Sequence, residues 1–451
     1  MLKRKIDAEL ESFFADSGKA ALLVTGARQV GKTFSIREFA RRRFSCLVEI
    51  NFIKMPSAKA IFTEGMTMDD FVVRLSALAE SPMPPGETLV FFDEVQECPE
   101  IVTYIKFLVD DGRFRYALSG SLLGVELKNL RSAPVGYLRE IQMFPLDLEE
   151  FVRAVGLKDE VFAHVRSCWT DVKPVDAIVH QKMMSLLRLY LVVGGMPAVV
   201  QKYIDTKNVA EVVKVQKSII VEYRKDATKY AHGSRMDVLR VLELLPEELN
   251  KRSKRFHVAD VKSGSRYERL EDNFIWLREA GIALQVCSVT DPRTPLRLSR
   301  NSNMFKLFMN DVGLLAASYM DGIQLRILNS ELDINFGSVY ENAVAQELVA
   351  HGFLPSYYSS REHGEIDFVL ETGGKILPIE VKSGKHYKRH RALNKLMECD
   401  EYGIESAIVF DDDAMDVVGK VFYAPIYMVM FLKKDSLPAN MIYDVGKPLR
   451  L

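Results

Sequence analysis

The chain has 451 residues, of which 48% are hydrophobic and 27% charged, and these proportions exclude a disordered or a fibrous protein. Its 60 basic and 61 acidic residues nearly cancel, so a contact with nucleic acid or a membrane would have to come from a local patch. Five scattered cysteines without a C-x-x-C pair argue against a disulfide framework or a zinc site, and the first residues contain no apolar signal segment. We therefore expect a cytoplasmic protein of several domains with no membrane partner.

The first motif is a phosphate-binding loop. An apolar run at residues 21–25 precedes the string GARQVGKT, and residues 34–40 follow with apolar positions at helical spacing. This order of strand, loop and helix is the context in which G-x-x-x-x-G-K-[ST] binds phosphate. The two glycines allow a tight loop with inward N–H groups, the lysine reaches the β- and γ-phosphates, and the threonine offers its hydroxyl to Mg²⁺. The motif predicts that ATP or ADP is bound by Gly26, Gln29, Val30, Gly31, Lys32, Thr33 and Phe34.

A strand is predicted at residues 47–52, a helix at 68–79, and then a continuous apolar run at 88–92 that ends in Asp93 and Glu94. Such a run is typical of a strand buried on both faces of a parallel sheet, whose carboxyl end is where ligands bind. Asp93 is predicted to hold Mg²⁺, and Glu94 to polarise the water that attacks the γ-phosphate. The alternative is that the pair only caps a helix.

The next predicted strand, residues 115–118, ends in Ser119-Gly120-Ser121, and an alternating strand at 138–146 closes the sheet. Either serine is in a position to contact the γ-phosphate, and the alternative is a simple Gly-Ser turn. Arg131 and Arg139 are candidates for an arginine finger.

The strings GARQVGKT, LVFFDE, LSGS and FPLDLEEF resemble a prokaryotic family of AAA-type ATPases with a C-terminal domain of unknown function. The later strings YLVVGGMPAVV, FKLFMNDVGLL, GSVYENAVAQEL and PIEVKSG fit the same family, so the resemblance covers nearly the whole chain. It implies a parallel sheet with flanking helices at residues 1–150, a sensor role for Ser119 or Ser121, and a homo-oligomer as one option. Many relatives have Gly-Arg where this chain has residues 134–139, which leaves the arginine finger open.

The middle of the chain is predicted to be helical. Residues 148–156, 182–193 and 208–223 have helical patterns, and Gly194-Gly195 with Pro197 end the second of them. We expect residues 151–207 to form a helical lid, with the paired glycines as a hinge. Asp226, Lys229 and Tyr230 fall where the family has a similar cluster of unassigned role.

Residues 208–330 are predicted to form a winged-helix module. The expected order is three helices (236–244, 258–261 and 265–280) and then strands at 283–289, 296–298 and 304–308. Winged helices are helix-turn-helix variants that bind DNA, and the basic run at 251–255 is suited to phosphate contacts. The alternative is a protein–protein spacer, because nearby acidic residues dilute the positive charge.

Residues 331–451 are predicted to form a third, α/β domain. A helix at 337–348 carries Glu341, a strand follows at 357–360, and strands at 364–370 and 376–382 form a hairpin that turns at Gly373-Gly374. A strand at 407–410 and a closing helix at 424–430 complete it. An Asp on one strand of the hairpin and Glu-x-Lys on the next resemble the PD-(D/E)XK nuclease fold.

That resemblance implies a second catalytic site. Asp367 and Glu380 would ligate Mg²⁺ or Mn²⁺, Glu341 would complete the metal shell, and Lys382 would orient or activate the water. The alternative is an ordinary hairpin with charged residues on its solvent face. A basic patch at 385–391 suits a phosphate backbone or is a solvated loop.

Together these features predict an ATP-binding, Mg²⁺-dependent ATPase whose nucleotide state moves the middle module and gates a DNA-binding, nuclease-like domain. The alternative is a nucleotide-dependent regulatory or signalling switch whose C-terminal domain only binds.

Overall fold

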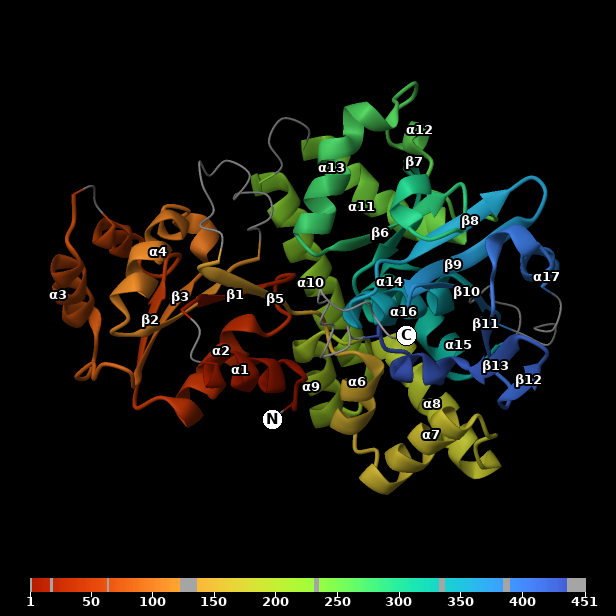
Figure 1. Ribbon diagram of the computed structural model, residues 1–451, viewed down its shortest axis with the longest axis horizontal. Coiled ribbons are helices and arrows are strands. Elements are labelled where there is room, and N and C mark those ends of the chain that lie inside the picture. Colours follow the sequence, from red (N-terminus) through yellow and green to blue (C-terminus); the bar gives the residue numbers. More distant parts are fainter. Residues whose placement is uncertain are drawn as a thin grey trace, which may run out of the picture.

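The computed structural model describes residues 2–16, 19–62, 65–121, 136–230, 235–331, 337–383 and 390–435. Arg131 and the basic residues at 385–389 lie outside these ranges. Figure 1 shows an α/β domain built from the N-terminal part of the chain, a larger body built from the rest, and helix α10 (Val209–Tyr230) between the two.

The N-terminal domain contains a five-stranded sheet in the order β2-β3-β4-β1-β5, and every neighbouring pair is parallel. Successive side chains of a strand point to opposite faces, so Leu22 and Phe91 lie in one core while Leu23 and Phe92 lie in the other. The strands are β1 (Ala21–Thr25), β2 (Cys46–Asn51), β3 (Thr88–Asp93), β4 (Arg115–Ser119) and β5 (Leu138–Gln142).

Helices cover both faces of this sheet, which confirms the predicted parallel sheet with flanking helices. The first face packs on α1 (Ile6–Ala15) and α2 (Lys32–Arg43), and the second on α3 (Met68–Leu78) and α4 (Ile101–Asp111). Helices α1 and α4 are additions to the elements predicted from the sequence.

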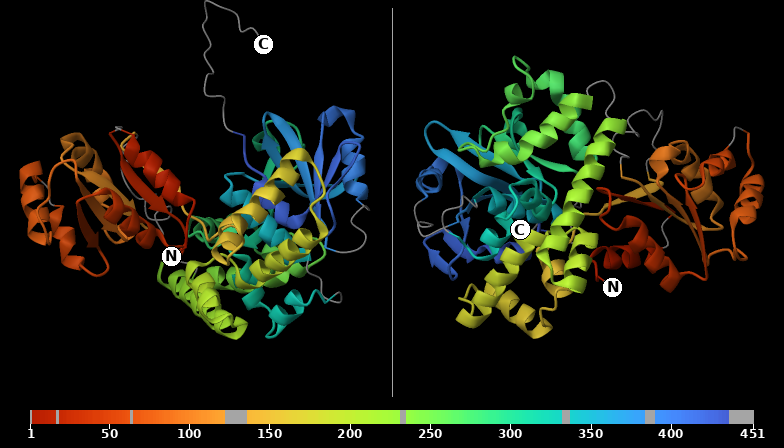
Figure 2. Two further views of the ribbon diagram at one scale, coloured as in Figure 1. Left: turned by 90° about the horizontal axis from the view of Figure 1, so that it is seen from below. Right: turned by 180° about the vertical axis from the view of Figure 1, so that it is seen from behind.

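A helical segment connects this domain to the rest of the molecule (Figure 2). It comprises α6 (Leu148–Ala154), α7 (Asp159–Asp171), α8 (Ala177–Val193) and α9 (Pro197–Thr206), followed by α10. Between α8 and α9, a Cβ atom on Gly194 would lie 2.1 Å from Asp311 Oδ1, and one on Gly195 would lie 2.0 Å from Leu146 O. The paired glycines predicted as a hinge are therefore held by close packing, which only glycine permits.

The predicted three-helix order of the middle module is present, as α11 (Arg235–Asn250), α12 (Val258–Val261) and α13 (Tyr267–Glu279), followed by β6 (Ala283–Val289) and β7 (Arg300–Met309). The predicted strand at 296–298 is wrong, because these residues lie in the 3-10 helix η4 (Leu296–Ser299). Leu296 N donates to the Glu371 carboxylate at 3.2 Å instead of to a neighbouring strand.

An eight-stranded mixed sheet forms the second core, in the order β12-β13-β11-β10-β9-β8-β6-β7. Strand β6 pairs in parallel with β8, with Cys287 opposite Ser356. The β6–β7 hairpin of the middle module thus belongs to the same sheet as the C-terminal strands, across the predicted boundary at 330/331. The other strands are β8 (Ser356–Ser360), β9 (Gly364–Thr372), β10 (Lys375–Val381), β11 (Ala407–Asp411), β12 (Asp416–Val418) and β13 (Val421–Pro425).

Helix α16 (Gly337–Ala350) packs against this sheet, and almost all of its residues are buried. The predicted hairpin with its turn at Gly373-Gly374 is confirmed as β9 and β10. The closing helix predicted at 424–430 is the end of β13 followed by the 3-10 helix η6 (Ile426–Phe431). Three short helices complete the body: α14 (Val312–Ser318), α15 (Ile323–Leu328) and α17 (Arg391–Met397).

In the described residues, no single helix is long and apolar enough to cross a membrane. Only α8 and α9 taken together reach that length and apolarity, and the chain bends by 120° between them.

Candidate active sites

The predicted phosphate-binding loop connects β1 to α2, as the motif requires. Gly26 has φ +132° and Gly31 has φ +98°, both in the region that favours glycine. A Cβ atom on Gly26 would lie 2.1 Å from Met143 O, so this position has no room for a side chain. The loop therefore has the left-handed turns and the close backbone approach of a phosphate cradle.

Lys32 is the charged group of this loop. Its side chain is buried, and Nζ donates to Gly26 O and to Ala27 O, at 2.8 Å in each case. Burial lowers the pKa of Lys32 to about 8, although the nearby Glu94 and Asp93 oppose the shift. A phosphate in the loop would replace the two carbonyl groups as the partner of this ammonium group.

Asp93 is the centre of a polar cluster at the carboxyl end of the sheet. Thr33 Oγ1 lies 3.1 Å from both of its carboxylate oxygens, Asn51 Nδ2 donates to Oδ2 at 2.8 Å, and Ser119 Oγ donates to Oδ1. The sheet brings these residues together because Asn51 and Ser119 stand opposite Asp93 on the two neighbouring strands. Hydroxyl and carboxylate oxygens beside a phosphate cradle are the donor set that Mg²⁺ prefers, so Thr33 and Asp93 fit this ion.

Glu94 follows directly in a strained conformation. Its backbone is left-handed, with φ 58° and ψ 47°, and its Oε2 accepts a hydrogen bond from Gln96 Nε2 at 2.5 Å. Left-handed backbone at a residue other than glycine is unfavourable and is found disproportionately at functional sites. The negative charge of Glu94 acts on Lys32, because it opposes the lowering of the lysine pKa by burial.

The other residues predicted for this site differ in burial and in their distance from the Asp93 cluster. Val30 is fully buried, whereas the Phe34 side chain is 53% exposed. Ser121 is buried and, within the described residues, its hydroxyl makes no hydrogen bond, so Ser119 is the serine that joins the Asp93 cluster. Arg139 stands opposite Leu22 in the sheet, away from the loop, with its guanidinium 5.7 Å from the centre of the Phe13 ring.

Several residues that hold the loop are not part of the motif. Arg4 donates to Val30 O at 3.0 Å, and Arg28 forms an ion pair with Asp226 of α10 at 2.5 Å. Lys229, also on α10, lies 3.2 Å from Glu97 in the turn after Glu94. Asp226 and Lys229 belong, with Tyr230, to the cluster that the family resemblance left without a role. Their ion pairs bring α10 into contact with the P-loop and with the turn after Glu94.

A second site lies on the β9–β10 hairpin. Asp367, Glu380 and Lys382 line one cavity of about 610 Å³. Val381 N donates to Asp367 Oδ2 at 2.9 Å, and Lys382 Nζ donates to Glu380 Oε2. Residues two apart on a strand share a face, so the three side chains predicted from the Asp and Glu-x-Lys pattern do meet.

Two further lysines enter this carboxylate cluster. Lys306 of β7 is fully buried, and its Nζ lies 2.8 Å from Glu365 Oε1 and 3.8 Å from Asp367 Oδ1. Glu341 of α16 has Lys254 Nζ at Oε1 and Lys306 Nζ 3.7 Å from Oε2. Oε1 of Glu341 is thus held by Lys254, whereas its buried Oε2 accepts no hydrogen bond within the described residues, so the predicted role of Glu341 as a metal ligand stays a prediction.

The surrounding charges and burial shift the pKa values of Asp367 and Glu380 in opposite directions. Burial, and then the charge of Asp367, raise the pKa of Glu380 to about 8. Burial alone would also raise the pKa of Asp367, but the ammonium groups of Lys306 and Lys382 outweigh it and hold that pKa below its usual value. Asp367 and Glu380 retain carboxylate oxygens that line the cavity, which fits a hard divalent cation such as Mg²⁺ or Mn²⁺.

The cavity also has a basic wall. Lys251, Arg252 and Arg391 line it together with the acidic residues. The basic run of the middle module and the hairpin of the C-terminal part therefore meet at one cavity.

Comparison with known proteins supports the assignment of the N-terminal domain. Residues 18–152 match a family model described as an AAA domain. Residues 184–325 and 336–427 match two models described as domains of unknown function, DUF8612 and DUF4143. The N-terminal part of the chain is therefore similar to AAA-type P-loop domains, and this similarity suggests ATP binding and hydrolysis with a divalent cation, typically Mg²⁺.

Among solved structures, a Walker-type ATPase of Pyrococcus abyssi is 15% identical over 71% of this chain and 96% of its own, with a TM-score of 0.43. The Orc1 protein of Aeropyrum pernix in complex with DNA is 13% identical over 72% and 92%, with a TM-score of 0.29. RuvB of Thermotoga maritima is 15% identical over 65% and 89%, with a TM-score of 0.28. A search of curated proteins found no match.

Proposed function

We propose that this protein hydrolyses ATP with Mg²⁺ and that its nucleotide state is coupled to a nuclease-like, DNA-binding site on the β9–β10 hairpin. The observation that carries the ATPase part is the Asp93 cluster: Thr33 and Ser119 contact one carboxylate next to the buried Lys32. A phosphate loop, a metal-ligand pair and a polar residue on the next strand are the parts that phosphoryl transfer needs.

In this proposal each residue has one task. Lys32 and the loop N–H groups bind the β- and γ-phosphates, and Thr33 and Asp93 hold the cation, which neutralises developing phosphate charge when bound. Glu94 polarises the attacking water, for which its carboxylate must turn away from Gln96. Ser119 senses the γ-phosphate through Asp93.

The coupling part rests on contacts between the P-loop and the larger body. Arg28 of the loop pairs with Asp226, and a Cβ atom on Gly281 would lie only 2.8 Å from Ala27 N. If phosphate binding changes the conformation of the loop, its contacts with α10 and with the turn before β6 must change as well. Because β6 belongs to the same sheet as β9 and β10, a shift of that turn reaches the hairpin site.

The DNA part rests on the hairpin cavity. A helix with an acid, an Asp on one strand and Glu-x-Lys on the next reproduce the PD-(D/E)XK pattern, and Lys251, Arg252 and Arg391 supply cationic groups for a phosphate backbone. In this reading Asp367 and Glu380 hold the cation and Lys382 orients the water. The middle module contributes as a winged helix through its basic run.

A second candidate is a regulatory switch whose C-terminal site binds without cutting. The lysines in the carboxylate cluster favour it, because Lys254 and Lys306 supply positive charge where a nuclease would use a metal ion. Binding scaffolds commonly keep such a fold and lose the chemistry.

ATP hydrolysis by the purified full chain tests the part that both candidates share. Lys32→Ala and Glu94→Gln are each expected to reduce the rate by about 100-fold or more, whereas Lys214→Ala, at an exposed position on α10, leaves it unchanged. A Lys32→Ala protein that hydrolyses ATP at the wild-type rate would refute the assignment.

A cleavage assay separates the two candidates. Branched, linear and single-stranded DNA are incubated with Mg²⁺ or Mn²⁺, and cutting that disappears in Asp367→Ala and in Glu380→Ala but not in the control Glu401→Ala supports the nuclease. DNA binding without cutting of any substrate supports the switch.

A further inference from the structure

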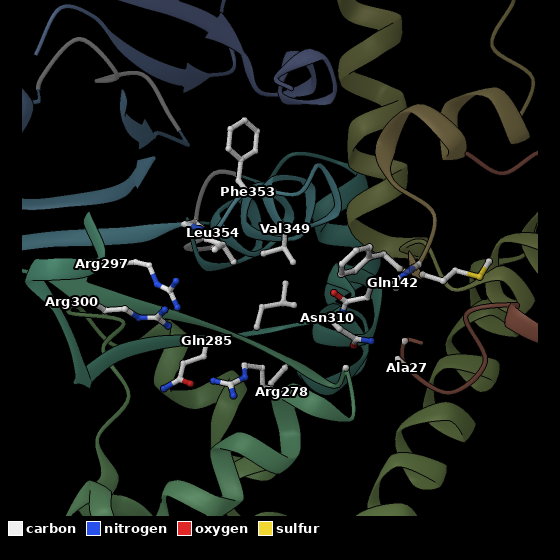
Figure 3. Close-up of a pocket in the computed structure, with 18 residues that line it drawn as sticks. Ala27, Gln142, Arg278, Gln285, Arg297, Arg300, Asn310, Val349, Phe353 and Leu354 are labelled. Atoms are coloured by element: carbon white, nitrogen blue, oxygen red, sulfur yellow. The ribbon is translucent and has the colours of Figure 1, made fainter. Parts of the chain in front are cut away.

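A cavity of about 350 Å³ lies where the P-loop faces the larger body, on the side of the loop that is next to β5 (Figure 3). Gly26 and Ala27 form one part of its wall, and residues 142–145 after β5 form another. The opposite side comes from the larger body, through α13, β6, β7 and the end of α16. Apart from Gly26 and Ala27 of the P-loop, none of the functional residues assigned above lines this cavity.

Its most unusual feature is positive charge that is only partly compensated. Arg278, Arg297 and Arg300 all line it, from three different elements, and among the described residues no aspartate or glutamate does. Arg297 forms no ion pair in the described part of the chain, and the contact of Arg300 is to the thiol of Cys287 at 3.1 Å. Arg278 is paired with its neighbour Glu279. Guanidinium groups without an acidic partner, such as those of Arg297 and Arg300, are the usual means of binding phosphate, because each offers a planar pair of donors.

Most of the other side chains that line the cavity are apolar. Val349 and Leu354 supply an apolar wall, and Leu354 is 76% exposed, whereas the buried Phe353 ring points away from the arginines in Figure 3. Asn310 also lines the cavity, is only 3% exposed, and its Oδ1 accepts no hydrogen bond within the described residues. A buried acceptor without a partner is unfavourable unless a ligand or water supplies a donor.

From these three observations we propose that the cavity binds a small phosphate monoester with a planar, apolar body, of about the size of a mononucleotide. The phosphate lies among Arg278, Arg297 and Arg300, the planar part lies on Val349 and Leu354, and a donor on the ligand meets Asn310 Oδ1. The apolar wall argues against inorganic phosphate alone, and three positive charges suit a phosphate dianion better than a carboxylate. Since Gly26 and Ala27 form part of the wall, the ligand contacts the P-loop on the side that faces residues 142–145.

The test uses 1-naphthyl phosphate as the probe, in titration calorimetry with the full chain saturated with ADP and Mg²⁺. One probe is expected to bind per chain, more tightly than inorganic phosphate or 1-naphthoate. The double variant R297Q/R300Q is expected to weaken binding by about tenfold or more, since hydrogen bonds to charged groups are lost. Arg293→Gln is the matched control, because Arg293 is an exposed arginine of the same segment that pairs with Asp291.

A second variant, Leu354→Asp, changes only the exposed mouth of the cavity and is expected to weaken binding by charge repulsion. Equal affinity of R297Q/R300Q and wild type would overturn the proposal, as would the absence of binding at millimolar probe. Probe binding that occurs only without ADP would also overturn it, because the cavity would then belong to the nucleotide site.

Discussion

At the scale of single residues, the nucleotide site depends on Lys32 and on the acids around it. The ammonium group is buried against two carbonyl groups, and its pKa is lowered to about 8. The free protein therefore begins to lose this charge just above neutral pH.

This gives a pH prediction for ADP binding. Below pH 8 Lys32 is already charged, so the affinity for ADP is nearly constant. Above pH 8 phosphate binding has to restore the proton, so the affinity falls by up to about tenfold per pH unit and one proton is taken up. Calorimetry at pH 7 and pH 9 in buffers of different ionisation enthalpy measures both quantities. An affinity that is equal at the two pH values, with no proton uptake, would contradict the assigned role.

Glu94 gives a prediction about stability. Its left-handed backbone is easier for glycine than for a residue with a Cβ atom, so Glu94→Gly is expected to be more stable than Glu94→Ala by about 1 kcal/mol. Both variants lose hydrolysis, which separates stability from activity. Urea unfolding measures the difference, and an alanine variant that is the more stable of the two would rule out backbone strain.

How far the sequence predicted these residues depends on how local the contacts are. Lys32, Thr33 and Asp93 were predicted because a motif fixes the loop and the strand end on which they stand. Asn51 and Arg4 were not, since their partners are distant in the chain and nothing in their neighbours marks them. The ion pair of Arg28 with Asp226 joins residues 198 positions apart, so only the folded chain reveals it.

At the scale of elements, α10 connects the nucleotide site to the larger body. Asp226→Asn removes the partner of Arg28, and Asp205→Asn on the exposed side of α9 is the matched control. A partly exposed ion pair contributes about 1 kcal/mol, so we expect amides of the P-loop and of residues 222–230 to exchange about fivefold faster in Asp226→Asn. Hydrogen-exchange mass spectrometry measures this, and exchange as slow as in Asp205→Asn would show that the pair does not hold the loop.

The β9–β10 hairpin gives a prediction about Lys306. Lys306→Met removes that ammonium group from the buried Glu341 and from the partly buried Glu365 and Asp367, which is expected to lower the free energy of unfolding by about 3 kcal/mol. If the acids can bind a metal ion, Mn²⁺ restores part of this loss and stabilises the variant more than the wild type. Lys375→Met, at an exposed ion pair with Glu405, is the control and is expected to change stability by less than about 1 kcal/mol. A loss that Mn²⁺ leaves unchanged would count against a metal ion at this site.

The elements show where sequence patterns are sufficient. Two features were predicted correctly: the strand and helix around the P-loop, and the hairpin with its Gly373-Gly374 turn. In both, the spacing of apolar residues and the positions of the glycines indicate the same structure. Residues 296–298 were predicted as a strand in the expected order of a winged helix, but they lie in a 3-10 helix whose first amide, Leu296 N, donates to the Glu371 side chain. The Gly194-Gly195 pair was read as a hinge, although its glycines are required by close contacts with Asp311 and Leu146.

At the scale of the whole molecule, the shared sheet changes how coupling can work. The sequence suggested that the middle module moves against the C-terminal domain. Because β6 is hydrogen-bonded to β8, these two parts form one body, and the interface that remains is the one at the P-loop, α10 and Gly281. We therefore expect nucleotide-driven motion between the N-terminal domain and everything after it.

The central claim is that the nucleotide state of the P-loop changes DNA binding at the hairpin cavity. The most direct measurement is the affinity of labelled branched DNA for the Glu94→Gln protein, by fluorescence anisotropy, with ADP and with ATP in turn. We expect affinities that differ by about fivefold or more between the two nucleotides, and a difference that disappears when Asp226→Asn is added. Equal affinities with ADP and ATP would contradict it.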